Sequence, residues 1–481
     1  MELLKITKKR SVLVSLFLLG ISTLFILIIS TTTSPIYCLE GGDSTIYKLL
    51  GLGITQGRIP YVDLFDNKGI YLYLINALGF CINDYRWGIF TLQIINLFVA
   101  LVFLYRTIRI FCQSAKSILV ISLSLFLLTG CYQGGNHVEE WMLPFLSIGF
   151  FTTINLFTKD TLTFSELYKN SILWGVGCGF VLMLRPNDAV AFYGGIMTGV
   201  TLWLFQKKNY RYAVVNIIIF ITSTLLTIAP VIIWYACHEE LHTLFYAVFG
   251  VNSLIAGGVE GQLFTLFKWG KWAILLLIVT LCVMITSTQY KKMLWGVVPI
   301  SIIQVILLGD KMYAHYFIPL FPLLTLYVTM IFIQQHKPVI ILAVAILCLS
   351  HRPLPRMAAL NLYSSYRLLC NNTCTSQTLY HCPIPEEERS KVWNYSVDPW
   401  RPGTPLSWFI RNNIVQCNRR TGSLDQYVKE IDFKTTSPLW VVSYGHEFEK
   451  NSNSTYYYIT DSISTQYYTL LFYKKDANLY W

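Results

Sequence analysis

The hydrophobic positions of the chain gather in long runs that are separated by short polar segments. The first run extends from Val12 to Ile29, and ten more follow at residues 87–105, 117–131, 141–157, 171–184, 189–205, 213–236, 272–288, 294–308, 314–333 and 338–350. A helix needs roughly 20 apolar residues to cross a bilayer, so these runs predict a mainly α-helical, polytopic membrane protein with about 11 transmembrane helices. The predicted membrane domain covers residues 1–350.

The pattern changes after the last of these runs. Residues 351–481 contain no apolar run long enough to span a bilayer, and they are rich in proline, tyrosine and tryptophan. Two stretches, Leu439–Tyr444 and Tyr467–Tyr473, have the β-branched and aromatic residues that are typical of strands. We expect a small soluble C-terminal domain of the α/β or α+β class.

The distribution of Lys and Arg predicts how the spans are oriented. Basic residues precede the first run, and they recur in every second loop after it. Because loops rich in Lys and Arg stay in the cytoplasm, the N-terminus is expected there and the first loop, residues 32–86, outside. An odd number of spans also places residues 351–481 on the external side.

Composition supports the membrane class and removes one alternative. The chain has 481 residues, of which 54% are hydrophobic and 13% charged, which is too apolar for a soluble enzyme of this size. A net charge of +11 would favour an anionic partner in a soluble protein. Here most basic residues lie in short loops between spans, so orientation explains the charge and we expect no nucleic-acid partner.

The first external loop carries the main candidate chemistry. Its four charged candidates are Asp43, Asp63, Asp66 and Lys68. Charges placed against a bilayer are costly to desolvate, so such a cluster predicts a functional site. Asp43 can also cap a helix, which Gly57 would end.

Other external loops add polar residues at the ends of predicted spans. They are His137, Glu139, Glu140, Arg185 and His315. Adjacent residues on a helix do not share a face, so we expect at most one of Glu139 and Glu140 to point inward.

The segment G-R-I-P-Y-V-D-L-F-D-N-K-G, running into an apolar helix, resembles the GT-C superfamily of polytopic membrane glycosyltransferases. That superfamily includes protein O-mannosyltransferases and aminoarabinose transferases, and the pattern is most similar to a bacterial branch with a soluble C-terminal domain. Three further segments also resemble it: G-G-N-H-V-E-E at 134–140, L-R-P-N at 184–187 and Y-A-H-Y-F-I-P at 313–319.

The resemblance implies an enzyme of the bacterial inner membrane with its C-terminal domain in the periplasm. It would move a hexosyl or pentosyl group from a polyprenyl-phosphate donor to a glycan, lipid or protein acceptor on the external face. Membrane lipids are the other expected partners. No cofactor is implied with certainty, and a divalent cation is left open because no metal-ligand spacing is diagnostic.

The matched residues take roles from what this transfer requires. Asp43 is expected to be the base that deprotonates the acceptor hydroxyl, with inversion at the anomeric carbon. Lys68, Arg185 and His315 would bind the donor phosphate. Acceptor or orienting roles fall to Asp63, Asp66, Glu139, Glu140 and His137.

Each assignment has a structural alternative. Asp43 can be a helix cap, Lys68 can extend to the lipid headgroups, and Arg185 can interact with a helix C-terminus. His315 can be a packing residue.

Other functional classes stay open beside the transferase. An oligosaccharide ligase or oligosaccharyltransferase that uses a lipid diphosphate would share these features. A glycolipid transporter or flippase is less favoured, because the charges cluster at one membrane face.

Overall fold

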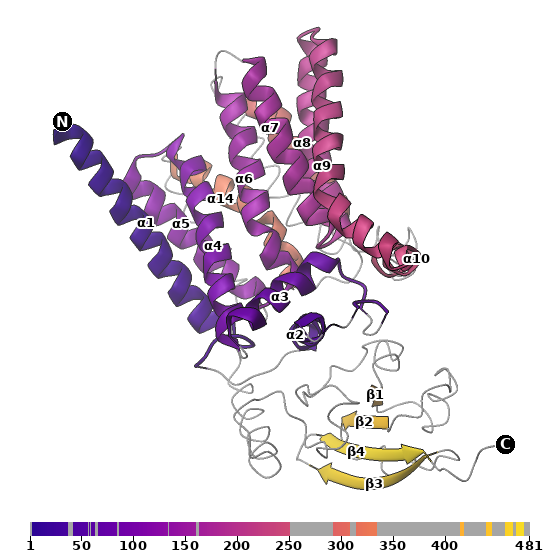
Figure 1. The fold of residues 1–481 in the computed structure, drawn as a ribbon. Coiled ribbons are helices and arrows are strands. Elements are labelled where there is room, and N and C mark those ends of the chain that lie inside the picture. Colours follow the sequence, from indigo (N-terminus) through magenta and orange to yellow (C-terminus); the bar gives the residue numbers. More distant parts are fainter. Residues whose placement is uncertain are drawn as a thin grey trace. The chain divides into compact units, whose positions relative to one another are not determined.

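The computed structural model describes a set of helices and four strands. The described residues are 2–36, 42–55, 57, 59–62, 66–83, 86–132, 134–159, 163–250, 292–307, 314–333, 414–417, 439–444, 457–464 and 468–475. They belong to two compact units (Figure 1). Unit 1 comprises Met1–Ser30, Asn67–Leu72 and Phe90–Leu354, and unit 2 comprises Thr31–Asp66, Tyr73–Ile89 and Pro355–Trp481.

The regular elements of unit 1 are all helices in the part of the chain that the structure describes. Its elements are α1 (Glu2–Ile29), α4 (Arg86–Arg109, which begins in unit 2), α5 (Ser114–Leu128), η1 (Thr129–Cys131), α6 (Val138–Thr158), α7 (Phe164–Leu182), α8 (Pro186–Gln206), α9 (Tyr210–Cys237), α10 (Leu241–Phe245), the π-helix η2 (Tyr246–Gly250), α13 (Leu294–Leu307), η4 (Ala314–Leu320) and α14 (Phe321–Ile333). One hydrophobic core lies among α1, α4, α5 and α14, with Leu97, Leu101 and Val120 at 0% exposure.

Unit 2 contains two helices of the first loop and a sheet. Helix α2 (Gly42–Thr55) begins beside Asp43 and ends before Gly57, as the sequence predicts, and Gly57 has a φ of +79° that favours glycine. Helix α3 (Ile70–Ile82) starts in unit 1 and continues in unit 2.

The sheet of unit 2 has the strand order β1-β2-β4-β3. Its strands are β1 (Ile414–Cys417), β2 (Leu439–Tyr444), β3 (Tyr457–Ser464) and β4 (Tyr468–Lys475). Strand β1 pairs with β2 in parallel, and the other two pairs are antiparallel. Strands β2 and β4 fall on the two stretches with strand-like composition, while an external soluble domain stays a prediction.

The apolar runs correspond to helices wherever the structure describes them. Within the part of the chain that the structure describes, six helices are long and apolar enough to cross a membrane: Ser11–Ile29, Trp87–Arg109, Ser114–Cys131, Val138–Thr158, Pro186–Gln206 and Tyr210–Cys237. The run at 171–184 falls largely on α7, and those at 294–308 and 314–333 on shorter helices. The runs at 272–288 and 338–350 lie outside the described residues. The chain is a polytopic membrane protein, and the count of about 11 spans stays a prediction.

Glycines allow two helix pairs of unit 1 to pack closely. On α7, a Cβ at Gly175 would come within 2.5 Å of the Phe220 carbonyl oxygen on α9. On α8, a Cβ at Gly195 would come within 2.5 Å of the Ile300 Cα atom on α13. Small residues at such contacts let the backbones of membrane helices approach each other.

Neighbouring glycines of α8 provide a test of this packing. A Cβ at Gly194 would meet no atom within 4 Å, whereas one at Gly195 would meet the backbone of Ile300. Both changes to alanine gain helix propensity, but only Gly195→Ala has to push α13 away. We expect Gly195→Ala to lower the free energy of unfolding by about 1–3 kcal/mol.

The matched control is Gly194→Ala, which should keep or raise the stability of the protein. Thermal unfolding of both variants in the same detergent measures the difference. Equal midpoints for the two variants would contradict the close packing of α8 on α13.

Candidate functional site

The residue after Lys68 fixes where that lysine lies. The Gly69 N–H donates to the Leu184 carbonyl at 3.0 Å, and the Tyr71 N–H donates to the Met183 carbonyl at 3.1 Å. A Cβ at Gly69 would come within 2.0 Å of the Met183 carbonyl oxygen, so only glycine permits this approach. The segment of Lys68 is therefore bonded to the turn between α7 and α8.

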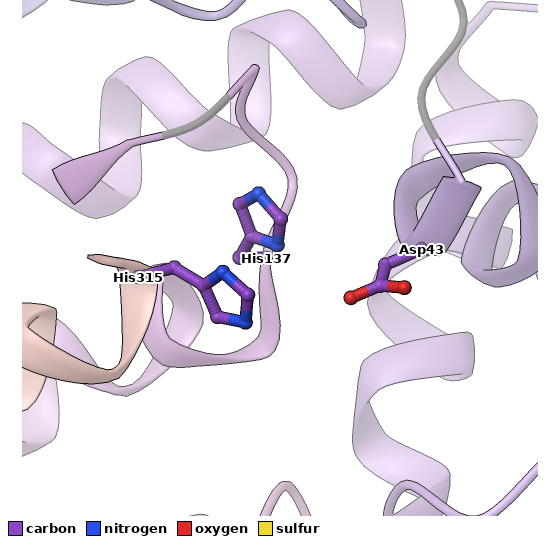
Figure 2. Close-up of side chains that lie close together, drawn as sticks. All are labelled: Asp43, His137 and His315. Atoms are coloured by element: carbon purple, nitrogen blue, oxygen red, sulfur yellow. The ribbon is translucent and has the colours of Figure 1, made fainter. Parts of the chain in front are cut away.

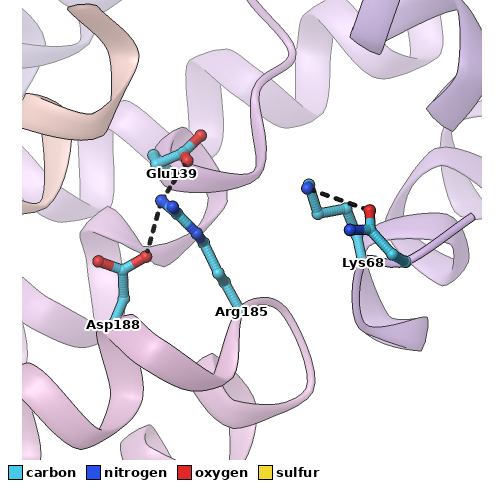
Figure 3. Close-up of polar contacts among 5 residues, drawn as sticks. Lys68, Glu139, Arg185 and Asp188 are labelled. Carbon is cyan, nitrogen blue, oxygen red and sulfur yellow. Dashed lines mark hydrogen bonds and ion pairs between the residues drawn. The ribbon is translucent and has the colours of Figure 1, made fainter. Parts of the chain in front are cut away.

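Arg185 lies in that turn, directly before the proline that starts α8. Its guanidinium Nη1 donates to the Glu139 Oε1 atom at 2.6 Å and forms an ion pair with Asp188 Oδ2 at 3.2 Å (Figure 3). Pro186 suits the first position of a helix, and Asp188 in the first turn suits the positive end of the dipole. The start of α8 thus supplies both the arginine and one of its two carboxylates.

Lys68 and Arg185 form the cationic part of this cluster. Figure 3 shows the side chains of Lys68 and Arg185 extending from two separate segments of the chain. The hydrogen bond of the Gly69 N–H to the Leu184 carbonyl connects these segments. Lys68 Nζ donates to the Asn67 Oδ1 atom at 3.2 Å, and the charges of Arg185 and Lys68 both act on the Asp188 carboxylate. We call Lys68, Arg185, Glu139 and Asp188 the charged cluster. It holds two cations and two anions at the ends of apolar helices.

Aromatic rings border the charged cluster. The Arg185 guanidinium lies 4.1 Å from the centroid of the Tyr316 ring, which favours a cation–π interaction. His315, beside it, stacks on His137 with the ring centroids 4.2 Å apart and an interplanar angle of 6°. Figure 2 shows these two parallel rings. Both histidines are buried.

The paired imidazoles have the chemistry of metal ligands. Their ligand atoms lie within 4.8 Å of one another, and imidazole nitrogen is a common ligand of zinc and other first-row metals. His137 and His315 could therefore supply two ligands to a divalent cation. The spacing of His137 and His315 in the sequence, 178 positions apart, gave no signal of this pairing.

Glu140 has a separate role at the start of α6. Its carboxylate accepts from the His137 N–H at 3.0 Å and from Gln93 Nε2 at 2.8 Å. Burial, and then the Glu140 carboxylate, raise the pKa of Tyr132 well above its usual value. Glu140 thus ties the loop before α6 to α4.

The expectation that at most one of Glu139 and Glu140 points inward is wrong. Both have 1% exposure, and they use different faces of α6, Glu139 toward Arg185 and Glu140 toward Gln93. Adjacent residues do not share a face, but here both faces are covered by other helices of the protein.

The acidic candidates of the first loop belong to unit 2. Asp43 lies half-buried in the first turn of α2 (Figure 2). Asp66 is buried and accepts from the Tyr73 hydroxyl at 2.8 Å. Burial, and then the Asp66 carboxylate, raise the pKa of Tyr73 well above its usual value. Asp63 lies outside the described residues.

The structure therefore brings two groups of candidates together. Lys68, Arg185 and Glu139 meet in the charged cluster, while His137 and His315 form the stacked pair. The sequence analysis missed Asp188, Gln93 and Tyr316 as site residues. The sequence could have indicated Asp188, because an acid three residues after Arg185 lies about one helical turn away and can pair with it. Gln93 and Tyr316 had no such signal, because their partners are distant in sequence.

A protein-family model matches residues 5–341, and its description is the competence-induced protein Ccs4 N-terminal domain. The chain belongs to this family. No curated protein sequence matches the chain.

Solved structures show the fold of this family member. ArnT from Cupriavidus metallidurans bound to undecaprenyl phosphate is similar with a TM-score of 0.60 and 10% identity, over 95% of this chain and 97% of that chain. The apo form of that ArnT gives 0.54 and 9%, over 97% and 98%. AglB from Archaeoglobus fulgidus, an archaeal oligosaccharyltransferase, gives 0.42 and 12%, over 89% and 69%. The ArnT likeness confirms the predicted GT-C-like fold.

Removing the arginine tests the charged cluster. Arg185→Met keeps much of the side-chain volume but leaves the Glu139 and Asp188 carboxylates without their cation. Breaking a buried ion pair costs about 3–5 kcal/mol in the free energy of unfolding, and we expect a loss near the lower end because the Arg185 side chain keeps 16% exposure. Thermal unfolding in detergent measures the loss.

Two further variants make this result specific. Adding Glu139→Gln and Asp188→Asn to Arg185→Met should recover most of the stability, because no unpaired charge remains. Lys159→Met removes a cation from the more exposed pair with Glu166 and should cost less than about 1 kcal/mol. Equal losses in Arg185→Met and Lys159→Met would show that the cluster is not buried as described.

Proposed function

We propose that this protein is an integral membrane glycosyltransferase that moves a sugar from a polyprenyl-phosphate donor to an acceptor on the external face of the membrane. The observation that carries the proposal is the charged cluster, in which Gly69 brings Lys68 to the turn that holds Arg185. Two cations at the ends of apolar helices suit a ligand with an anionic head and an apolar tail.

The fold supports the same substrate class. One of the two similar ArnT structures was solved with undecaprenyl phosphate bound, and the likeness extends over nearly the whole length of both chains. At 10% identity this likeness concerns the fold. We propose that this chain also binds a lipid phosphate. The transferred group would be a hexosyl or pentosyl unit, and the acceptor a glycan, lipid or protein.

The proposed roles of the described residues follow from where their side chains lie, and the role of Asp63 follows from the sequence. Lys68 and Arg185 bind the donor phosphate, and His315 contributes through its place beside Tyr316. Glu139 orients Arg185 through their hydrogen bond, and Glu140 orients His137 by accepting from its backbone N–H. Asp63 and Asp66 orient the first loop, Asp66 through the Tyr73 hydroxyl.

Asp43 is the proposed base. It lies half-buried in the first turn of α2, where the positive end of the helix dipole stabilises a carboxylate. One carboxylate beside the acceptor hydroxyl is sufficient for single-step transfer with inversion at the anomeric carbon. A retaining mechanism would need a nucleophile and a separate acid/base. The enzyme would lie in the bacterial inner membrane, with the N-terminus in the cytoplasm and residues 351–481 in the periplasm.

Binding of a lipid phosphate tests the proposed donor site. The purified full-length protein in lipid nanodiscs should bind undecaprenyl phosphate, and Lys68→Ala should weaken this binding about tenfold because it removes one charge that contacts phosphate. Lys207→Ala removes an exposed charge at the end of α8 and serves as the matched control. Titration by microscale thermophoresis measures the three dissociation constants.

Binding that is the same in Lys68→Ala and wild-type protein would place the phosphate elsewhere. Undecaprenyl diphosphate in a parallel titration distinguishes the ligase alternative, which requires tighter binding of the diphosphate.

Replacing the proposed base tests the mechanism. Asp43→Asn keeps the shape of the side chain and an oxygen that can cap α2, so folding should change little. It removes the proton acceptor, and the rate of sugar transfer should fall by about 10² to 10⁴. Transfer is measured in membranes from cells supplied with radiolabelled sugar, with product configuration determined by NMR.

A role of Asp43 in capping alone predicts normal turnover in this variant. A folded Asp43→Asn protein with wild-type transfer, or a product that retains the configuration of the donor, would exclude the mechanism.

A further inference from the structure

The charged cluster contains its own counter-anions. Arg185 Nη1 contacts both the Glu139 Oε1 atom at 2.6 Å and the Asp188 Oδ2 atom at 3.2 Å. With Lys68, the cluster has two cations and two carboxylates, so its formal charge is balanced before any ligand enters. A site built only to hold an anion tightly would keep its cations free of carboxylates.

One of these carboxylates is incompletely satisfied. Among the residues that the structure describes, the buried Glu139 Oε2 atom accepts no hydrogen bond. The Glu139 side chain is 2% exposed, so bulk water does not screen its charge. Its negative charge therefore acts on any anion that binds beside Arg185.

An anion that enters the cluster meets attraction and repulsion together. Like charges about 6 Å apart repel by roughly 3 kcal/mol at an effective dielectric constant of 20. A phosphate must share Arg185 with Glu139 and Asp188, and the repulsion grows with the charge on the phosphate. The two carboxylates consequently weaken binding, and they weaken the binding of a dianion most.

We propose that Glu139 and Asp188 are resident counter-anions that discriminate between the two lipid phosphates of the reaction and favour release of the spent carrier. This inference rests on the proposed function. Transfer forms a bond between the acceptor oxygen and the anomeric carbon and breaks the bond between that carbon and the phosphate oxygen, which keeps the electron pair. The proton of the acceptor hydroxyl goes to Asp43. The donor is a phosphodiester with one charge, and the product is a monoester.

The monoester carries about −1.5 to −2 at neutral pH, since its second pKa is near 6. The reaction thus creates negative charge beside two carboxylates that are already in place. Glu139 and Asp188 repel the product more strongly than the donor.

The test compares two lipids that differ in one charge. Undecaprenyl phosphate represents the product, and its methyl ester represents the phosphodiester head of the donor. Asp188→Asn removes one counter-anion and leaves Arg185 paired with Glu139, so the variant should fold. We expect Asp188→Asn to bind undecaprenyl phosphate about tenfold more tightly than wild type, and the methyl ester only about threefold.

Glu139→Gln should behave in the same way, and Glu166→Gln, which removes a carboxylate from the exposed pair with Lys159, should leave both affinities unchanged. A gain in affinity separates this role from a structural one, because a merely destabilised site binds more weakly. Unchanged or weaker binding of undecaprenyl phosphate in Asp188→Asn and Glu139→Gln would overturn the inference.

The same titrations keep the two proposals apart. If Lys68→Ala weakens binding but the carboxylate variants gain no affinity, the proposed role of the counter-anions is wrong and the proposed function stands. If the protein does not bind undecaprenyl phosphate, or if Lys68→Ala leaves this binding unchanged, both the proposed function and the role of the counter-anions are wrong.

Discussion

The need to neutralise a partly buried arginine shapes the charged part of this protein. Arg185 lies between two helices of a membrane protein, where an unpaired charge would cost several kcal/mol. Glu139 from α6 and Asp188 from α8 meet this need through one guanidinium nitrogen, Nη1. The contacts of Arg185 therefore join the starts of two helices, and they also set the electrostatic conditions for any anion that binds there.

Close backbone approach is the second condition for the cluster. Gly69 lets its segment pack against the Met183 carbonyl, and this contact brings Lys68 to the turn of Arg185. Other glycines allow whole helices to pack closely, as Gly195 of α8 does against α13. The position of Lys68 and the packing of the helices thus both depend on glycines at close backbone contacts.

The sequence predicts where the helices of this fold lie better than it predicts which side chains contact each other. Apolar runs locate the spans because a bilayer requires them, and Gly57 marks the end of α2 through its positive φ. The pairing of Arg185 with Glu139, 46 positions apart, depends on how α6 and α8 pack, which hydropathy does not encode. For the same reason the burial of both Glu139 and Glu140 was not predicted. The resemblance of the first-loop motif to the GT-C superfamily correctly predicted the fold.

The position of a bound lipid phosphate tests the central claim most directly. A cryo-electron microscopy structure of the full chain in nanodiscs with undecaprenyl phosphate would locate the phosphorus atom relative to the charged cluster. The account predicts phosphate oxygens within hydrogen-bond distance, about 3 Å, of Lys68 Nζ and the Arg185 guanidinium. A phosphate bound away from both residues, with Arg185 still held by Glu139 and Asp188, would contradict it.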